Sequence, residues 1–162
     1  FVFGLFLLSL KTSVLFWQIS SFTLAHSVTL IAGALGLINV PTSIVEPLIA
    51  TSIVFVAVEN IFFSKLNKWR TLLVFSFGLL HGLGFASVLA EFGLPEGQFL
   101  PALIGFNIGI EIGQLSVIAI AYLFLGLTFG KKPYYRTFIS IPASCIIAAI
   151  GTWWVFERVL LT

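Results

Sequence analysis

Two histidines and one glutamate lie in the middle of long apolar stretches. His26 lies within FTLAHSVTL, His81 within FGLLHGLGFAS, and Glu111 within GFNIGIEIGQ. A charged side chain at the centre of a membrane span costs about 2.5–3.5 kcal/mol on insertion scales, whereas an interhelical hydrogen bond contributes only about 0.6 kcal/mol. Hydrogen bonding between helices is therefore a weak reason to keep three ionisable groups at such positions. We expect a metal or proton site inside a membrane, with all three side chains as metal ligands.

Two amides flank Glu111 at helical spacing. Asn107 lies four residues before it and Gln114 three residues after it, so a helix places the three side chains in one stripe. We expect the amides to complete or orient the ligand shell. The alternative is that they join neighbouring helices through hydrogen bonds.

Glycines form a second pattern beside these polar residues. Small residues at every fourth position let the backbone of another helix approach closely. The glycines with this spacing are Gly78 and Gly82 on either side of His81, and Gly105, Gly109 and Gly113 around Glu111. We expect all five to be helix-packing positions that bring polar side chains within reach of one ion.

Two further glutamates share another apolar stretch, Glu46 near its beginning and Glu59 near its end. We expect Glu59 to support the polar site as part of an exit path, or to pair with Lys65 or Lys68 in the connection that follows. Glu46 is expected to be stabilised by the dipole at the start of its helix.

The available donors narrow the choice of metal. The chain has no methionine, and its single cysteine, Cys145, lies in an apolar stretch, so a cysteine-based metal site is excluded. Imidazole together with carboxylate and amide oxygens suits Ni²⁺, Co²⁺, Zn²⁺ or Fe²⁺ better than Cu⁺. A weak, open site of this kind suits a permease, because the ion must also leave.

The composition indicates an integral membrane protein. Apolar residues make up 59% of the 162 residues and charged residues only 9%, against about 25% charged residues in soluble domains. The net charge of +2 gives no reason to expect nucleic-acid binding. The apolar runs are continuous rather than alternating, which favours helices over a β-barrel. We expect one all-α, polytopic transmembrane domain (1–162) with apolar segments at 1–10, 15–37, 44–63, 71–91, 99–125 and 137–156.

The first segment is about half as long as a membrane span, at about 1.5 Å per residue. We therefore expect about five full helices and part of a first one, with the rest of that helix and a signal peptide or extracytoplasmic region upstream. Basic residues gather in alternate connections, namely Lys11, then Lys65, Lys68 and Arg70, then Lys131, Lys132 and Arg136. Connections 39–43 and 92–98 contain none. The basic connections are expected to face the cytoplasm, and both ends of the sequence to face outward.

Five ordered motifs cover most of the chain: FTLAHSVTL (22–30), VEPLIATSIVFVAVEN (45–60), FGLLHGLGFASVLAEFGLP (77–95), GFNIGIEIGQ (105–114) and FERV (156–159). They resemble the HupE/UreJ family of hydrogenase- and urease-associated membrane proteins, particularly its branch with an added extracytoplasmic region. The resemblance implies a bacterial inner-membrane protein that takes up Ni²⁺, with Co²⁺ as second choice, and carries no permanently bound cofactor. It also implies ion-handling roles for His26, His81, Glu111 and Glu59. The family pattern includes a His and an Asp-His motif just before a stretch like FVFGLFLLS, and this sequence begins after that point.

The expected function is thus that of a divalent metal permease rather than an enzyme. One alternative is a non-catalytic membrane anchor or accessory subunit of a larger complex. Another, less favoured, is an intramembrane hydrolase with a metal-bound water, although neither a GxSxG nor an HExxH motif occurs. The expected partners are the lipid bilayer, the metal ion, and a larger membrane complex or further copies of the chain.

Overall fold

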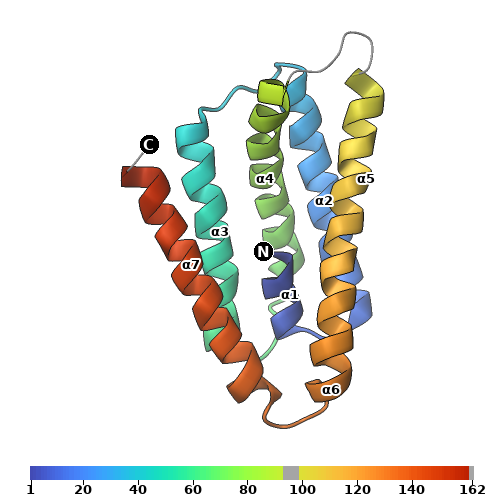
Figure 1. Cartoon of the computed structure of the whole chain (residues 1–162), viewed down its shortest axis with the longest axis vertical. Helices are drawn as coiled ribbons and strands as arrows, with labels where there is room; N and C mark the ends of the chain where they lie inside the picture. Colours follow the sequence, from blue (N-terminus) through green and yellow to red (C-terminus); the bar gives the residue numbers. More distant parts are fainter. Residues whose placement is uncertain (93–98, 161–162) are drawn as a thin grey trace.

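The computed structural model describes residues 1–92 and 99–160 and shows an elongated helical bundle, with no strand in either range (Figure 1). Its elements, in chain order, are α1 (Val2–Leu8), α2 (Thr12–Ala34), α3 (Thr42–Phe62), α4 (Arg70–Phe92), α5 (Phe99–Ala121), the π-helical turn η1 (Tyr122–Gly126), α6 (Leu127–Phe129), the π-helical turn η2 (Arg136–Ser140) and α7 (Ile141–Leu160). The predicted all-α fold is confirmed. Residues 93–98, which carry the predicted fourth connection, lie outside the described ranges.

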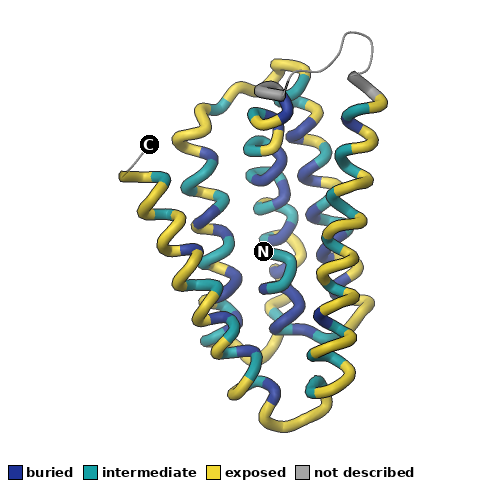
Figure 2. The backbone as a smooth tube through the Cα atoms, viewed as in Figure 1, coloured by how far each residue is buried: buried dark blue, intermediate teal, exposed yellow. Residues whose placement is uncertain are grey.

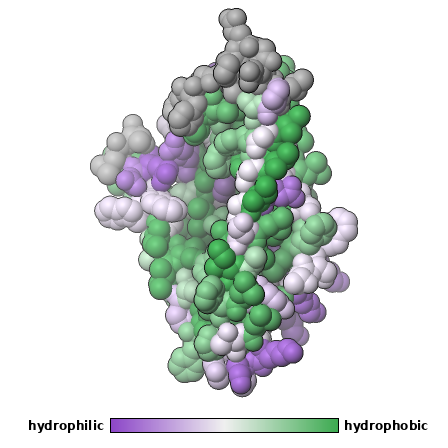
Figure 3. All heavy atoms as spheres, turned by 45° about the vertical axis from the view of Figure 1, so that its right-hand side comes forward, coloured by the Kyte–Doolittle hydropathy of each residue, from purple (hydrophilic) through white to green (hydrophobic). Residues whose placement is uncertain are grey.

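Five helices are long and apolar enough to cross a membrane: Thr12–Ala34, Thr42–Phe62, Arg70–Leu89, Pro101–Phe129 and Arg136–Leu160. Helices suit this environment because every backbone polar group in lipid must find its partner within the protein. The surface that carries α5 is hydrophobic over most of its length, and hydrophilic residues gather at its lower end (Figure 3). The chain is therefore a multi-pass membrane protein.

The helix boundaries differ from the predicted segments by a few residues. One shift concerns α2, which ends at Ala34 instead of continuing to residue 37. Gly36 adopts a left-handed conformation with φ of 70°, and Leu37 donates a backbone hydrogen bond of 2.9 Å to the carbonyl of Ala32. Glycine takes this conformation without steric cost, so Gly36 ends the helix in a Schellman-like turn.

Helices α2 and α4 pack closely because glycines face α2. A β-carbon at Gly78 would lie 2.6 Å from the carbonyl oxygen of Phe22, and one at Gly82 would overlap the carbonyl of His26 and the hydroxyl of Thr29. The Thr29 hydroxyl also donates a hydrogen bond of 2.8 Å to the Leu79 carbonyl on α4. Small residues thus join α2 and α4 into one tightly packed pair.

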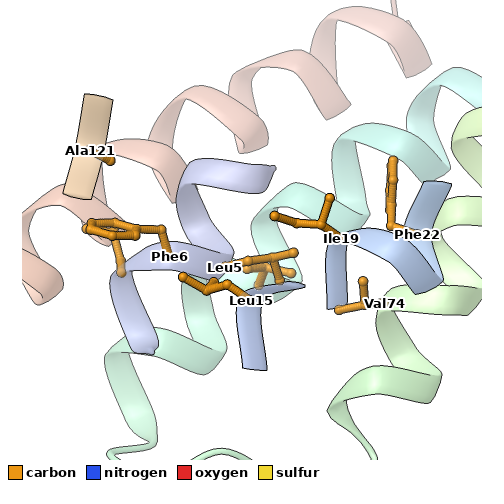
Figure 4. Packing of buried hydrophobic residues seen from close by; sticks show 9 residues of the cluster. Leu5, Phe6, Leu15, Ile19, Phe22, Val74 and Ala121 are labelled. Atoms are coloured by element: carbon orange, nitrogen blue, oxygen red, sulfur yellow. The ribbon is translucent and has the colours of Figure 1, made fainter. Parts of the chain in front are cut away.

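The short helix α1 lies in the middle of the bundle, in contact with α2, α3, α5 and α7 (Figure 1). Leu5, Phe6 and Leu7 are fully buried and pack with residues of α2, α4 and α5, as Figure 4 shows. Burial is concentrated on α1, α2, α3 and α4, whereas α5 and α7 expose long stretches (Figure 2). The core is therefore built around α1, and α5 and α7 contribute only a few residues to its edge.

A buried polar cluster joins α1, α3, α4 and α7 at the end of the bundle that carries the basic connections. Arg70 is 1% exposed, forms an ion pair of 3.1 Å with Glu59 and donates a 3.4 Å hydrogen bond to Asn60. The Asn60 amide donates to the Gly4 carbonyl at 2.8 Å and to the Ser144 hydroxyl at 3.2 Å. The partner of Glu59 is thus Arg70, not Lys65 or Lys68 as the alternative interpretation of Glu59 had it. Arg70 begins a helix and is directed inward, whereas the two lysines lie exposed in the connection.

We predict that Gly82→Val lowers the free energy of unfolding by about 1–3 kcal/mol, because its side chain must displace the α2 backbone. Gly105→Val is the matched control, since a β-carbon at Gly105 meets no atom within 4 Å. Unfolding of the purified protein in mixed detergent micelles measures both. Equal losses of stability in the two variants would contradict close α2–α4 packing.

We predict that Glu59→Leu destabilises the protein by about 3–5 kcal/mol, because it leaves the Arg70 guanidinium buried without its counter-charge. The double variant Glu59→Leu/Arg70→Met should recover most of this loss. The same unfolding measurement tests both, with the exposed Glu157→Gln as control. Additive losses in the double variant would show that the two charges are not coupled.

Candidate functional site

His26 is the most unusual polar residue in the interior. It lies on the buried face of α2, which also carries Gln18, Phe22 and Thr29. The ring is 0% exposed, and neither ring nitrogen has a hydrogen-bond partner. Buried polar atoms in proteins are bonded in the great majority of cases. An imidazole buried without a partner is therefore a candidate ligand for a bound ion.

His81 lies on α4 and meets the Phe22 ring edge-on. Its Nδ1 is 2.8 Å from the Phe77 carbonyl, which can only accept a hydrogen bond, so Nδ1 carries the proton and Nε2 the lone pair. This arrangement orients the ring, as backbone carbonyls do for many metal-binding histidines. His81 also contacts the ring of Phe1, the first residue of the sequence, at a centroid distance of 5.1 Å, and both line a space bounded by α3, α4 and α7.

The two histidines lie close together around one aromatic side chain. The Phe22 ring is stacked against His26 at a centroid distance of 6.1 Å and meets His81 edge-on at 5.1 Å. Phe85 contacts the other side of His26 at 5.2 Å. The close approach of α2 and α4 thus brings the two imidazoles into one aromatic environment.

Two polar side chains on α5 form hydrogen bonds with side chains of α2, the helix that carries His26. The Ser27 hydroxyl lies 2.7 Å from Oδ1 of Asn107, and the Thr23 hydroxyl 3.2 Å from Oε1 of Gln114. Asn107 also lies beside the His26 ring. Both amides therefore join α5 to α2, as expected if their role is to hydrogen-bond neighbouring helices. Asn107 also lies near His26.

Glu111 lies one turn from Asn107 on α5, and its side chain is half-buried. Within residues 1–92 and 99–160, no hydrogen bond or ion pair engages its carboxylate. No three His, Cys, Asp or Glu side chains are grouped as a metal site in these ranges. The structure therefore brings His26 and His81 together but does not assemble them with Glu111 into one three-ligand group.

Glu59 belongs to a different part of the molecule. Its carboxylate is held by Arg70 in the buried cluster at the end of the bundle, near the basic connections. It is thus a member of a structural network and not of the shell around His26 and His81.

The five glycines divide into two groups. Gly78 and Gly82 lie against α2, where they permit the approach of His26 and His81. At Gly105, Gly109 and Gly113 an added β-carbon would meet no atom within 4 Å. No helix among the described residues packs against these three glycines, so their role as helix-packing positions stays a prediction.

The sequence patterns did not indicate the α2 partners of Asn107 and Gln114 on α5. Thr23 and Ser27 are spaced four residues apart and bind Gln114 and Asn107, which are spaced seven apart. Hydroxyl residues at helical spacing beside His26 are the signal that could have indicated them. Arg70 was assigned to a connection by its charge, and no local pattern distinguishes it from the neighbouring lysines.

Comparisons with known proteins agree with this architecture. The model of one protein family, described as HupE / UreJ protein, matches residues 1–158. No curated protein and no solved structure gives a match. Since the family match covers nearly the whole chain, from α1 to within two residues of the end of α7, the chain belongs to the HupE/UreJ family.

Proposed function

We propose that this protein is a permease for a divalent transition metal ion, with Ni²⁺ as the first candidate and Co²⁺ as the second. The HupE/UreJ family is associated with accessory transport of nickel and cobalt rather than with catalysis. In this proposal the ion is cargo, and the protein holds no permanent cofactor. The membrane is the bacterial inner membrane, with the basic connections in the cytoplasm.

The observation that carries the proposal is the buried, unpartnered imidazole of His26 beside the oriented imidazole of His81. Leaving buried polar atoms without partners costs about 1–3 kcal/mol per group. A passing cation offsets this cost by accepting the lone pair of a neutral imidazole. Two nitrogen donors with the Asn107 amide beside them form a weak site that suits Ni²⁺ or Co²⁺ and also releases the ion.

Glu111 supplies the charge in this mechanism. Its half-buried carboxylate lies on the same helix as Asn107, which reaches His26. A carboxylate at this depth partly neutralises an ion that leaves the two imidazoles. We therefore assign Glu111 to the binding step that follows release of the ion from His26 and His81, rather than to a fixed three-ligand site. Asn107 and Gln114 keep α5 in register with α2.

We predict that His81→Ala and Glu111→Gln each reduce Ni²⁺ uptake at least tenfold, because each removes a donor that the ion needs within the membrane. The measurement is the initial rate of uptake by the full-length protein in proteoliposomes, with equilibrium Ni²⁺ binding to the same preparations. Ser76→Ala on α4 and Ser116→Ala on α5 are matched controls, since both hydroxyls are exposed and bond only within their own helix. Unchanged uptake and binding in both test variants would overturn the permease.

A further inference from the structure

The end of the bundle that carries the basic connections presents positive charge with little to balance it. Its exposed basic side chains are Lys11, Lys65, Lys68, Lys131 and Lys132. No acidic residue occurs in the connections 9–11, 63–69 and 130–135. The glutamate in the buried cluster at this end, Glu59, already neutralises Arg70. This end of the molecule therefore attracts a negatively charged partner.

Two of these lysines, Lys11 and Lys65, line one groove of about 370 Å³ between the α1–α2 and α3–α4 connections. We call it the basic groove. Its other lining residues are two serines, Ser9 and Ser64, and four apolar residues, Leu8, Leu10, Val14 and Leu66. The lining therefore combines two positive charges with an extended apolar wall, which suits a ligand that is both anionic and apolar.

Hydrogen bonds hold both walls of the basic groove in place. On one side the Ser9 hydroxyl accepts a hydrogen bond of 3.4 Å from the backbone of Lys11. On the other side the Arg136 guanidinium donates to the carbonyls of Ile61 at 3.0 Å and Phe63 at 2.7 Å, directly before Ser64. The groove is therefore formed before any ligand binds, which lowers the entropic cost of binding.

The basic groove lies at the level of the membrane surface. It adjoins the start of α2 and the end of α3, both of which are long and apolar enough to span a membrane. Trp17 near the start of α2 and Trp69 just before α4 are 67% and 68% exposed, and exposed tryptophans favour the interface between lipid and water. A ligand in the groove therefore lies at the depth of the lipid headgroups.

We propose that the basic groove binds an anionic phospholipid, with the phosphate between Lys11 and Lys65 and the first acyl carbons against the apolar wall. Lysine ammonium groups donate hydrogen bonds to phosphate oxygens and attract the negative charge of the headgroup. A zwitterionic phospholipid brings its own cation, which the two lysines repel. A soluble acidic peptide would satisfy the lysines but leave the apolar wall uncovered. The proposal does not depend on metal transport.

Lipid binding to the full-length protein in detergent, followed by native mass spectrometry, tests this proposal. The probes are dioleoylphosphatidylglycerol, which is anionic, and dioleoylphosphatidylcholine, which has the same acyl chains and no net charge. The wild type should bind the anionic lipid at least about fivefold more tightly. Lys11→Gln/Lys65→Gln should reduce this preference to less than about twofold, whereas Lys11→Arg/Lys65→Arg should keep it, because only the first variant removes the charges.

Lys131→Gln/Lys132→Gln is the matched control, since it removes the same charge from two exposed lysines that do not line the groove. It should keep the preference for the anionic lipid. An equal loss of preference in both glutamine variants would overturn the proposal, because binding would then follow net charge alone.

Two further outcomes separate a lipid from other anionic ligands. A large excess of glycerophosphoglycerol, the water-soluble headgroup, should leave the lipid bound, because it makes no contact with the apolar wall. Displacement of the lipid by this headgroup would overturn the proposal in favour of a soluble phosphate ester. A wild type without lipid preference that binds polyglutamate through Lys11 and Lys65 would overturn it in favour of an acidic peptide.

Discussion

The close approach of α2 and α4 at Gly78 and Gly82 is the constraint on which the candidate site depends. Any side chain at these two positions would push the helices apart, because the α2 backbone fills the space where a β-carbon would lie. At this separation His26 and His81 contact the same phenylalanine ring, Phe22. The glycines have no ligand chemistry of their own, yet they determine how far apart the two imidazoles lie.

Polar groups occupy three levels along the bundle, and the levels differ in burial and in hydrogen bonding. At one end Arg70 and Glu59 neutralise each other and join four helices through Asn60. In the middle neither ring nitrogen of His26 is within hydrogen-bond distance of a partner, although the Asn107 amide lies beside the ring. At the other end Glu46 and Arg158 form a half-exposed ion pair. The Arg70–Glu59 pair neutralises its own charges and holds four helices together, whereas the His26 ring remains available to an ion.

The fold was largely predictable from the sequence because a bilayer permits few kinds of secondary structure. Continuous apolar runs of about 20 residues must be helices, and the predicted segments differ from the observed helices by only a few residues. The candidate site was predictable in part. The depth of His26 and His81 follows from counting residues along a helix, but the direction in which each side chain points depends on its neighbours. The partner of Glu59 could not be predicted, because Arg70 resembles the nearby lysines in charge and in position along the chain.

The sequence alone determined that the chain is a helical membrane protein with ionisable groups inside its apolar spans, because burial costs and helix length are local properties of the residues. The tertiary structure decided which groups meet. It brought His26 and His81 together, left Glu111 outside a three-ligand group, and exposed the glycine stripe of α5. It also paired Glu46 with Arg158. These outcomes depend on how each helix is rotated about its axis, and that rotation is set by packing between segments far apart in the chain.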